Sequence, residues 1–151
     1  MSYSTKEEVR EMLKDDALNA IIGDTFIEDP AEREELVEPL IEAAIADADA
    51  EIDGYLAKRY TVPISPAPRV LNKFSKDIAV YNLFSRIGID ESTDQKTYLN
   101  RYNAAINFLT LVAEGKVSIG TETEDPASAA ATGFSAKSNP RLFTRAKMRG
   151  M

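Results

Sequence analysis

Cysteine and histidine are both absent from the 151 residues. Their absence excludes disulfide bonds, thiol nucleophiles, zinc sites of the cysteine–histidine type and catalytic triads with a histidine base. Apolar runs are short, and none approaches the roughly 20 residues that cross a bilayer. Glycine-rich phosphate-binding patterns do not occur, and the opening MSYSTKEEVREML lacks a signal peptide's apolar centre. We therefore expect no membrane partner, no metal, no cofactor, and synthesis in the cytosol.

What remains is an acidic chain of one-domain size with an uneven distribution of charge. Residues 1–125 hold 13 basic and all 25 acidic residues, a net charge of −12. Residues 126–151 hold five basic residues and no acid. A general nucleic-acid binder needs a basic body. The distribution instead favours a basic tail that docks onto an acidic surface, for example that of a neighbouring copy.

Apolar residues recur at intervals of three and four along much of the chain, which is typical of helices with one buried face. Thr5 and Glu8 form the pattern of a capping box, and Asp29 before Pro30 is the pattern of another helix start. Gly88 and the proline-rich YTVPISPAP mark helix ends. The predicted helices span about 5–14, 17–22, 30–59, 68–87 and 92–114.

The third predicted helix is the longest, at about 45 Å, and we expect it to be central or to project from the body. Its apolar stripe comprises Leu36, Val37, Leu40, Ile41, Ala44, Ile45, Ala48, Ile52, Tyr55 and Leu56. KVSIG (116–120) alternates with period two and is a candidate short strand or hairpin. The sequence thus predicts an all-α fold, a small helical bundle with extended loops. Residues 1–120 form the body, and 121–151 form a linker and an extended C-terminal tail.

Four acids alternate in DADAEIDG, namely Asp47, Asp49, Glu51 and Asp53. A calcium loop of the EF-hand type requires glycine at its sixth position and an acid at its twelfth, and these positions hold Ile52 and Lys58. Ile52 also belongs to the apolar stripe, so we expect a helix with the acids on a solvated face. On that view Asp49→Asn changes stability little. Nothing in the sequence marks a pocket in which these carboxylates could do acid–base chemistry.

Two charged segments each have two interpretations. Residues 28–53 hold eleven acids and one base, which serves either solubility or the binding of a basic partner. The terminal NPRLFTRAKMRGM is either a disordered basic tail or a recognition peptide. In the second case Leu142 and Phe143 are apolar anchors, and Arg141 and Arg145 are charged ones.

Within residues 45–87, the stretch AEIDGYLAKRYTVPISPAPRVLNKFSKDIAVYNLF resembles the central block of the Mu-like phage neck protein family. The family pattern is E-I-D-G-Y-L-x-x-R-Y, a proline-rich loop, and a helix with D-I-A-x-Y-x-L. RYNAAINFLTLVAEGKVSIG (101–120) is similar to the family's helix that ends in G-K and a short strand. NPRLFTRAKMRGM is similar to its R-x-F-(S/T)-R-x-x-(M/L)-x-G terminus. The resemblance covers residues 4–151 and is weakest over 121–135.

This resemblance implies a non-enzymatic virion protein of a tailed phage, located in the neck and made in the host cytoplasm. Such proteins are head–tail connectors, or adaptors, that form a ring, commonly twelve-fold, beneath the portal protein. The ring binds the next neck or tail-completion protein, and DNA passes through it without specific binding. An extended C-terminal tail contacts the portal or a neighbouring subunit. The matching residues here are Pro140, Arg141, Leu142, Phe143, Arg145, Lys147, Met148 and Arg149.

Two rival functions remain open from the sequence. One is a nucleic-acid-binding or regulatory phage protein, of the antitermination type, that acts through its basic tail. The other is a metal-dependent hydrolase that uses the carboxylates between residues 47 and 53. Salt-dependent binding of DNA or RNA by the tail would favour the first, and tight binding of magnesium or calcium would favour the second.

Overall fold

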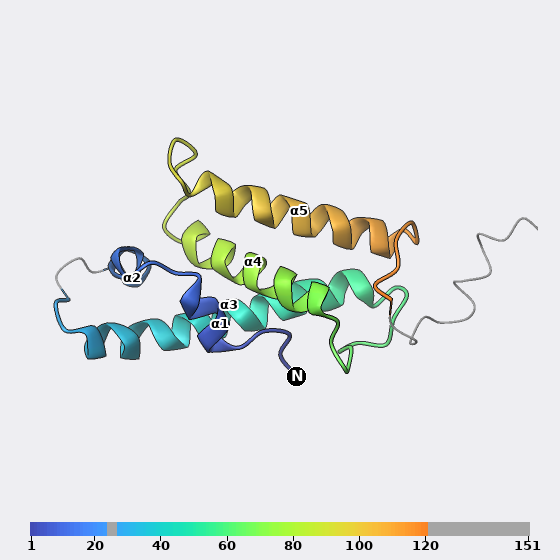
Figure 1. Ribbon diagram of the computed structural model, residues 1–151, viewed down its shortest axis with the longest axis horizontal. Helices are drawn as coiled ribbons and strands as arrows, with labels where there is room; N and C mark the ends of the chain where they lie inside the picture. The colour runs from blue at the N-terminus through green and yellow to red at the C-terminus, as the bar shows by residue number, and fades with distance from the viewer. Residues whose placement is uncertain (24–26, 121–151) are drawn as a thin grey trace, which may run out of the picture.

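A computed structural model describes residues 1–23 and 27–120, which fold into five helices without a strand (Figure 1). The all-α prediction is confirmed. No helix in these two ranges is both long and apolar enough to cross a membrane. The helices are α1 (Lys6–Glu11), α2 (Asp15–Ile22), α3 (Pro30–Leu56), α4 (Arg69–Ser85) and α5 (Lys96–Ala113).

The three long helices α3, α4 and α5 lie side by side, and each runs in the opposite direction to the one before it in the chain (Figure 1). Aromatic pairs between α4 and α5 show the antiparallel register, because residue numbers rise on one helix as they fall on the other. The pairs are Phe74–Phe108, Tyr81–Tyr102 and Phe84–Tyr98, with ring centroids 5.1, 4.0 and 4.5 Å apart. The short helices α1 and α2 pack against α3.

Local capping signals set the starts of α1 and α3 as the sequence predicts, whereas α2, α4 and α5 have no side-chain cap. The Thr5 hydroxyl accepts the Glu8 N–H (3.3 Å), and the Glu8 carboxylate accepts the Thr5 N–H (3.0 Å), which completes the capping box of α1. Asp29 accepts the N–H of Ala31 (3.0 Å) and caps α3. Pro39 lies inside α3 on its exposed side, where water can satisfy the carbonyl that a proline leaves without a partner.

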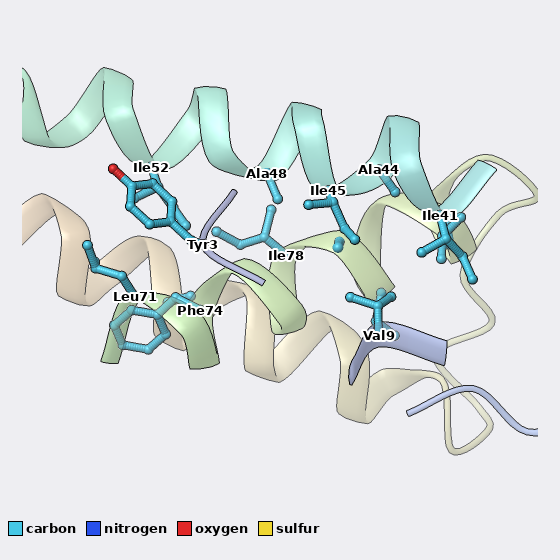
Figure 2. Close-up of a cluster of buried hydrophobic side chains, with 14 of the residues drawn as sticks. Tyr3, Val9, Ile41, Ala44, Ile45, Ala48, Ile52, Leu71, Phe74 and Ile78 are labelled. Atoms are coloured by element: carbon cyan, nitrogen blue, oxygen red, sulfur yellow. The ribbon is translucent and has the colours of Figure 1, made fainter. Parts of the chain in front are cut away.

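The core lies where α3 faces α4 and α5 (Figure 2). Most of the predicted stripe of α3 is buried, with Leu40 and Tyr55 half-buried, but Leu36 is an exception at 42% exposure. Ala44 and Ala48 are buried, and their short side chains allow the helix axes to approach. The buried residues of α3 are Val37, Ile41, Ala44, Ile45, Ala48, Ile52 and Leu56.

The candidate strand at 116–120 is wrong. This segment is held by side chains that follow α3. Arg59 Nη1 donates to the carbonyls of Val112 (2.9 Å) and Val117 (3.2 Å), and the Tyr60 hydroxyl accepts the N–H of Ile119 (3.4 Å). Ile119 is buried and Val117 half-buried. The alternation therefore reflects one side packed on the body, and residues 1–23 and 27–120 supply no partner strand for a ladder.

Truncation of two apolar residues of α3 tests this packing. Ile52 is fully buried and Leu36 is 42% exposed. We expect Ile52→Ala to lower the free energy of unfolding by about 2–5 kcal/mol, because it leaves a cavity, and Leu36→Ala to change it by less than about 0.5 kcal/mol. Urea denaturation followed by circular dichroism measures both. Equal losses for the two variants would contradict the burial described here.

Candidate functional site

The acidic stretch of α3 binds the N-terminal segment (residues 1–5) to the body. Asp49 Oδ2 accepts the hydroxyl of Ser2 (2.8 Å) and the N–H of Tyr3 (3.1 Å). Its Oδ1 accepts the hydroxyl of Ser75 on α4 (2.8 Å). The Ser75 hydroxyl also lies 2.8 Å from that of Ser4, and both serines are buried. One carboxylate thus joins the N-terminal segment, α3 and α4.

Tyr3 is the largest side chain of this attachment and is 4% exposed. Its hydroxyl donates to the carboxylate of Asp53 and accepts the N–H of Ile64 (2.9 Å). Burial first, and then the hydrogen bond to Asp53, raises the pKa of Tyr3 far above its ordinary value. Asn72 Nδ2 donates to the Tyr3 carbonyl (3.0 Å). The ring and the backbone of Tyr3 are therefore both held.

Glu51 is engaged on another side of α3. Its Oε1 accepts the hydroxyl of Tyr102 (3.0 Å), whose ring stacks on that of Tyr81. Burial, followed by the hydrogen bond to Glu51, raises the pKa of Tyr102 to about 12. Asp47 is exposed. The expected solvated acidic face is therefore wrong for Asp49, Glu51 and Asp53, because tertiary donors reach their carboxylates, and it holds only for Asp47.

An open groove of about 700 Å³ lies between the start of the chain and α3. Its apolar lining includes Ile45, Ala46 and Ala50, and the short side chains of the two exposed alanines leave space. Among the described residues that line it, Lys6 is the only one with a basic side chain, and it pairs with Glu38 and Glu42. We call this hollow the acidic groove. Its carboxylates belong to Glu7, Glu42, Asp49 and Asp53.

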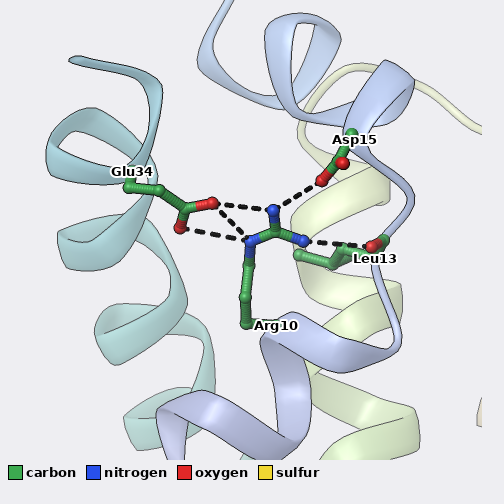
Figure 3. A network of polar contacts seen from close by, with 4 residues as sticks. All are labelled: Arg10, Leu13, Asp15 and Glu34. Atoms are coloured by element: carbon green, nitrogen blue, oxygen red, sulfur yellow. Dashed lines mark hydrogen bonds and ion pairs between the residues drawn. The ribbon is translucent and has the colours of Figure 1, made fainter. Parts of the chain in front are cut away.

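Arg10 fixes the end of α1 beside a smaller hollow of about 180 Å³ along α3. Figure 3 shows the Arg10 guanidinium between Glu34, Asp15 and the carbonyl of Leu13. Arg10 Nη2 donates to Glu34 (2.7 Å) and Asp15 (2.6 Å), and its Nη1 donates to the carbonyl of Leu13 (3.2 Å). The guanidinium lowers the pKa of Asp15. These contacts orient α1, α2 and α3, but the exposed carboxylates limit their contribution to stability.

Tertiary hydrogen bonds engage the carboxylates of this region. Asp49 already accepts three hydrogen bonds and Asp53 accepts that of Tyr3, so both carboxylates act as attachment points. Within residues 1–23 and 27–120 no three acidic side chains gather where they could hold a metal ion. The sequence-predicted partner-binding residues of the tail lie outside the described residues. They are Pro140, Arg141, Leu142, Phe143, Arg145, Lys147, Met148 and Arg149.

Comparison with known proteins identifies the family. Residues 3–137 match the family described as Bacteriophage Mu, Gp36. The chain belongs to this family. It is 33% identical over 94 residues to the Mu-like prophage FluMu protein gp36 of Haemophilus influenzae, a match that spans 62% of each chain. It is 31% identical over 105 residues to gene product J of Escherichia phage Mu, covering 69% of this chain and 70% of that protein. The resemblance to a Mu-like phage family is confirmed.

The geometry explains much of the E-I-D-G-Y-L-x-x-R-Y pattern in this member of the Gp36 family. Ile52 and Leu56 are core residues, whereas the polar positions reach other segments. Glu51 binds Tyr102, Asp53 binds Tyr3, Arg59 binds Val112 and Val117, and Tyr60 binds Ile119. The pattern therefore specifies how the body is held together.

Sequence reasoning missed the N-terminal partners Ser2, Tyr3 and Ser4. Ser75 offered a signal, because it follows Phe74 on the buried side of α4, and a hydroxyl at such a position requires a polar partner. No comparable signal exists for residues 2–4. Their partners are 46 to 71 positions further along the chain.

Asp49 and Asp47 form a matched pair for a test. Asp49→Asn replaces one accepting oxygen with a donor that faces other donors, so we expect a loss of about 1–3 kcal/mol in the free energy of unfolding. Asp47→Asn alters an exposed carboxylate on the same helix and should cost less than about 0.5 kcal/mol. Urea denaturation measures both. Equal stability of the two variants would contradict the role of Asp49.

Alkaline pH tests the buried tyrosines. The pKa values of Tyr3 and Tyr102 are raised in the folded chain, whereas an unfolded tyrosine titrates near pH 10. Their contribution to stability is therefore complete below about pH 10 and is lost as the pH rises toward 12. We expect the urea midpoint to fall across this window, and to fall less steeply in Tyr3→Phe. If the urea midpoints of the unchanged chain and of Tyr3→Phe fall equally steeply, the ionisation of Tyr3 is not linked to unfolding.

Proposed function

We propose that this chain is a structural subunit of the phage virion, the head-to-tail connector, or adaptor. In this role copies of the chain form a ring, commonly of twelve, beneath the portal protein and bind the next neck protein. Membership of the Mu Gp36 family supports a phage role. The observation that carries the assembly role is the separation of an acidic body from a basic terminus on one chain, because ring contacts join two different patches of neighbouring subunits.

The body has the properties of a building block. Its N-terminal segment is attached by Asp49 and Asp53, and residues 112–119 are held by Arg59 and Tyr60. These attachments confine the ends of the described body to fixed positions. A ring requires such rigidity, because a small angular error at each contact would prevent closure. We therefore propose a non-enzymatic role, in which the carboxylates hold the fold and present surfaces.

The exposed acids of α3 and the loop before it also suit this location. They make one side of the body strongly negative, and a negative wall repels the phosphates of DNA that passes through a ring. DNA would then move through the channel without being gripped. The exposed acids are Glu28, Asp29, Glu32, Glu34, Glu35, Glu38, Glu42 and Asp47.

Genetic complementation tests the proposal. A phage of this kind with its copy of the gene interrupted should produce filled heads and finished tails that remain unjoined, as seen by negative-stain electron microscopy. Supplying the full chain should restore joined particles, and a chain without residues 137–151 should not. The variant Ser138→Ala is the control, because it leaves the charge and the apolar anchors of the terminus unchanged.

The outcomes separate the parts of this proposal. Normal yields of joined particles without the gene would overturn the connector role. Restoration by the shortened chain would overturn the role of the terminus alone. Salt-dependent binding of duplex DNA or RNA by the purified full chain, without any defect in head–tail joining, would favour a nucleic-acid-binding function instead.

A further inference from the structure

We propose that the acidic groove is the docking site for the basic C-terminal segment, residues 137–151, of a neighbouring copy of this chain. The inference rests on the proposed function, because a ring supplies the neighbour, and it deepens that function by naming the two surfaces that meet. The groove lies on the described body, and the segment lies outside the described residues, so its part in the argument rests on its sequence.

The lining of the groove combines an apolar strip with carboxylates. Ala46 and Ala50 provide exposed apolar surface beside Ile45, and Glu42 and Asp53 stand at the two ends of the stretch of α3 that lines it. At 1.5 Å per residue that stretch is about 16 Å long. The internal bonds do not exhaust these carboxylates, because each can accept about four hydrogen bonds.

The C-terminal segment has a matching order of groups. Leu142 and Phe143 are an apolar pair between Arg141 and Arg145. An extended chain from residue 141 to residue 145 spans about 13 Å, which fits the length of the groove. In such a chain Arg141, Phe143 and Arg145 lie on one face, so the Phe143 side chain occupies the strip beside the alanines with Leu142 at its edge, and the two guanidinium groups reach carboxylates at its ends.

Charge favours this occupant over the body of another copy. The bodies repel one another, since residues 1–125 carry a net charge of −12, whereas the terminus carries five basic residues and no acid. Opposite charge steers the segment toward the groove and selects against a body-to-body contact there. Docking in trans also leaves each copy with one groove and one segment to offer, which is the heterologous pairing that closes a ring.

Cross-linking tests the contact directly, since the chain has no cysteine of its own. One full-length chain carries Ala46→Cys and a second, distinguished by a mass tag, carries Leu142→Cys. After mixing and mild oxidation, we expect mixed disulfide dimers on a non-reducing gel, several-fold more than with an Ala104→Cys partner. Ala104 is the matched control, because it is an exposed alanine on α5 and does not line the groove.

A charge exchange tests the electrostatic part. Adding Glu42→Arg to the Ala46→Cys chain should lower the dimer yield several-fold, and adding Arg141→Glu or Arg145→Glu to the Leu142→Cys chain, whichever residue lies at the Glu42 end, should restore it. Rescue of this kind excludes simple misfolding of the Glu42→Arg chain. If the dimer yield is the same with and without these substitutions, the proposed pairing of the charges is wrong.

The remaining outcomes also decide the proposal. Mixed dimers no more abundant than with Ala104→Cys would overturn docking in the groove. If both cysteines in one chain give only a disulfide-closed monomer, and the mixture gives no dimer, the segment occupies its own groove and docking in trans is wrong. Either result, obtained while head–tail joining still requires the gene, would leave the connector function standing and remove this inference alone.

Discussion

The buried stripe of α3 is the constraint on which the rest of the structure depends. Helices of the length of α1 and α2, six and eight residues, are not stable alone in water, and both pack against α3. The longer α4 and α5 also place their apolar residues against it or against each other. One 27-residue helix therefore provides the common surface on which four others become stable, and most of the apolar burial of the body involves it.

The acids at the border of this stripe make the packing specific. An apolar surface tolerates small rotations and shifts, but a half-buried carboxylate that must meet a given hydroxyl or N–H does not. Asp49, Glu51 and Asp53 point from one helix toward the N-terminal segment, α4 and α5. In this member the Gp36-family pattern thus encodes the internal register of the body. The acidic groove, where we propose that a neighbouring copy docks, shares Asp53 with this pattern and otherwise lies N-terminal to it.

Local signals were readable from the sequence and long-range partners were not. The capping box at Thr5 and the Asp29–Pro30 start act within one turn, and the period of the apolar residues needs no knowledge of the neighbours. The alternating acids looked like a solvated face because their partners, such as Tyr3 and Tyr102, are about fifty positions away. KVSIG looked like a strand for a related reason, since packing against Arg59 and Tyr60 produces the same alternation. Within the candidate site, the carboxylates of α3 could be predicted from the sequence, whereas the groups that donate to them and the groove could not.

The attachment of residues 2–4 has a consequence for the order of events during synthesis. Ser2, Tyr3 and Ser4 bind partners as far as 47, 69 and 71 positions further along the chain. At about 5–20 residues per second, the last of these partners is made roughly 4–14 s later. The hairpins of α3, α4 and α5 join neighbours in sequence and can form as they are made. Residues 2–4 can therefore be placed only after α3 and the first part of α4 have been made, and one wall of the acidic groove comes into existence only at that step.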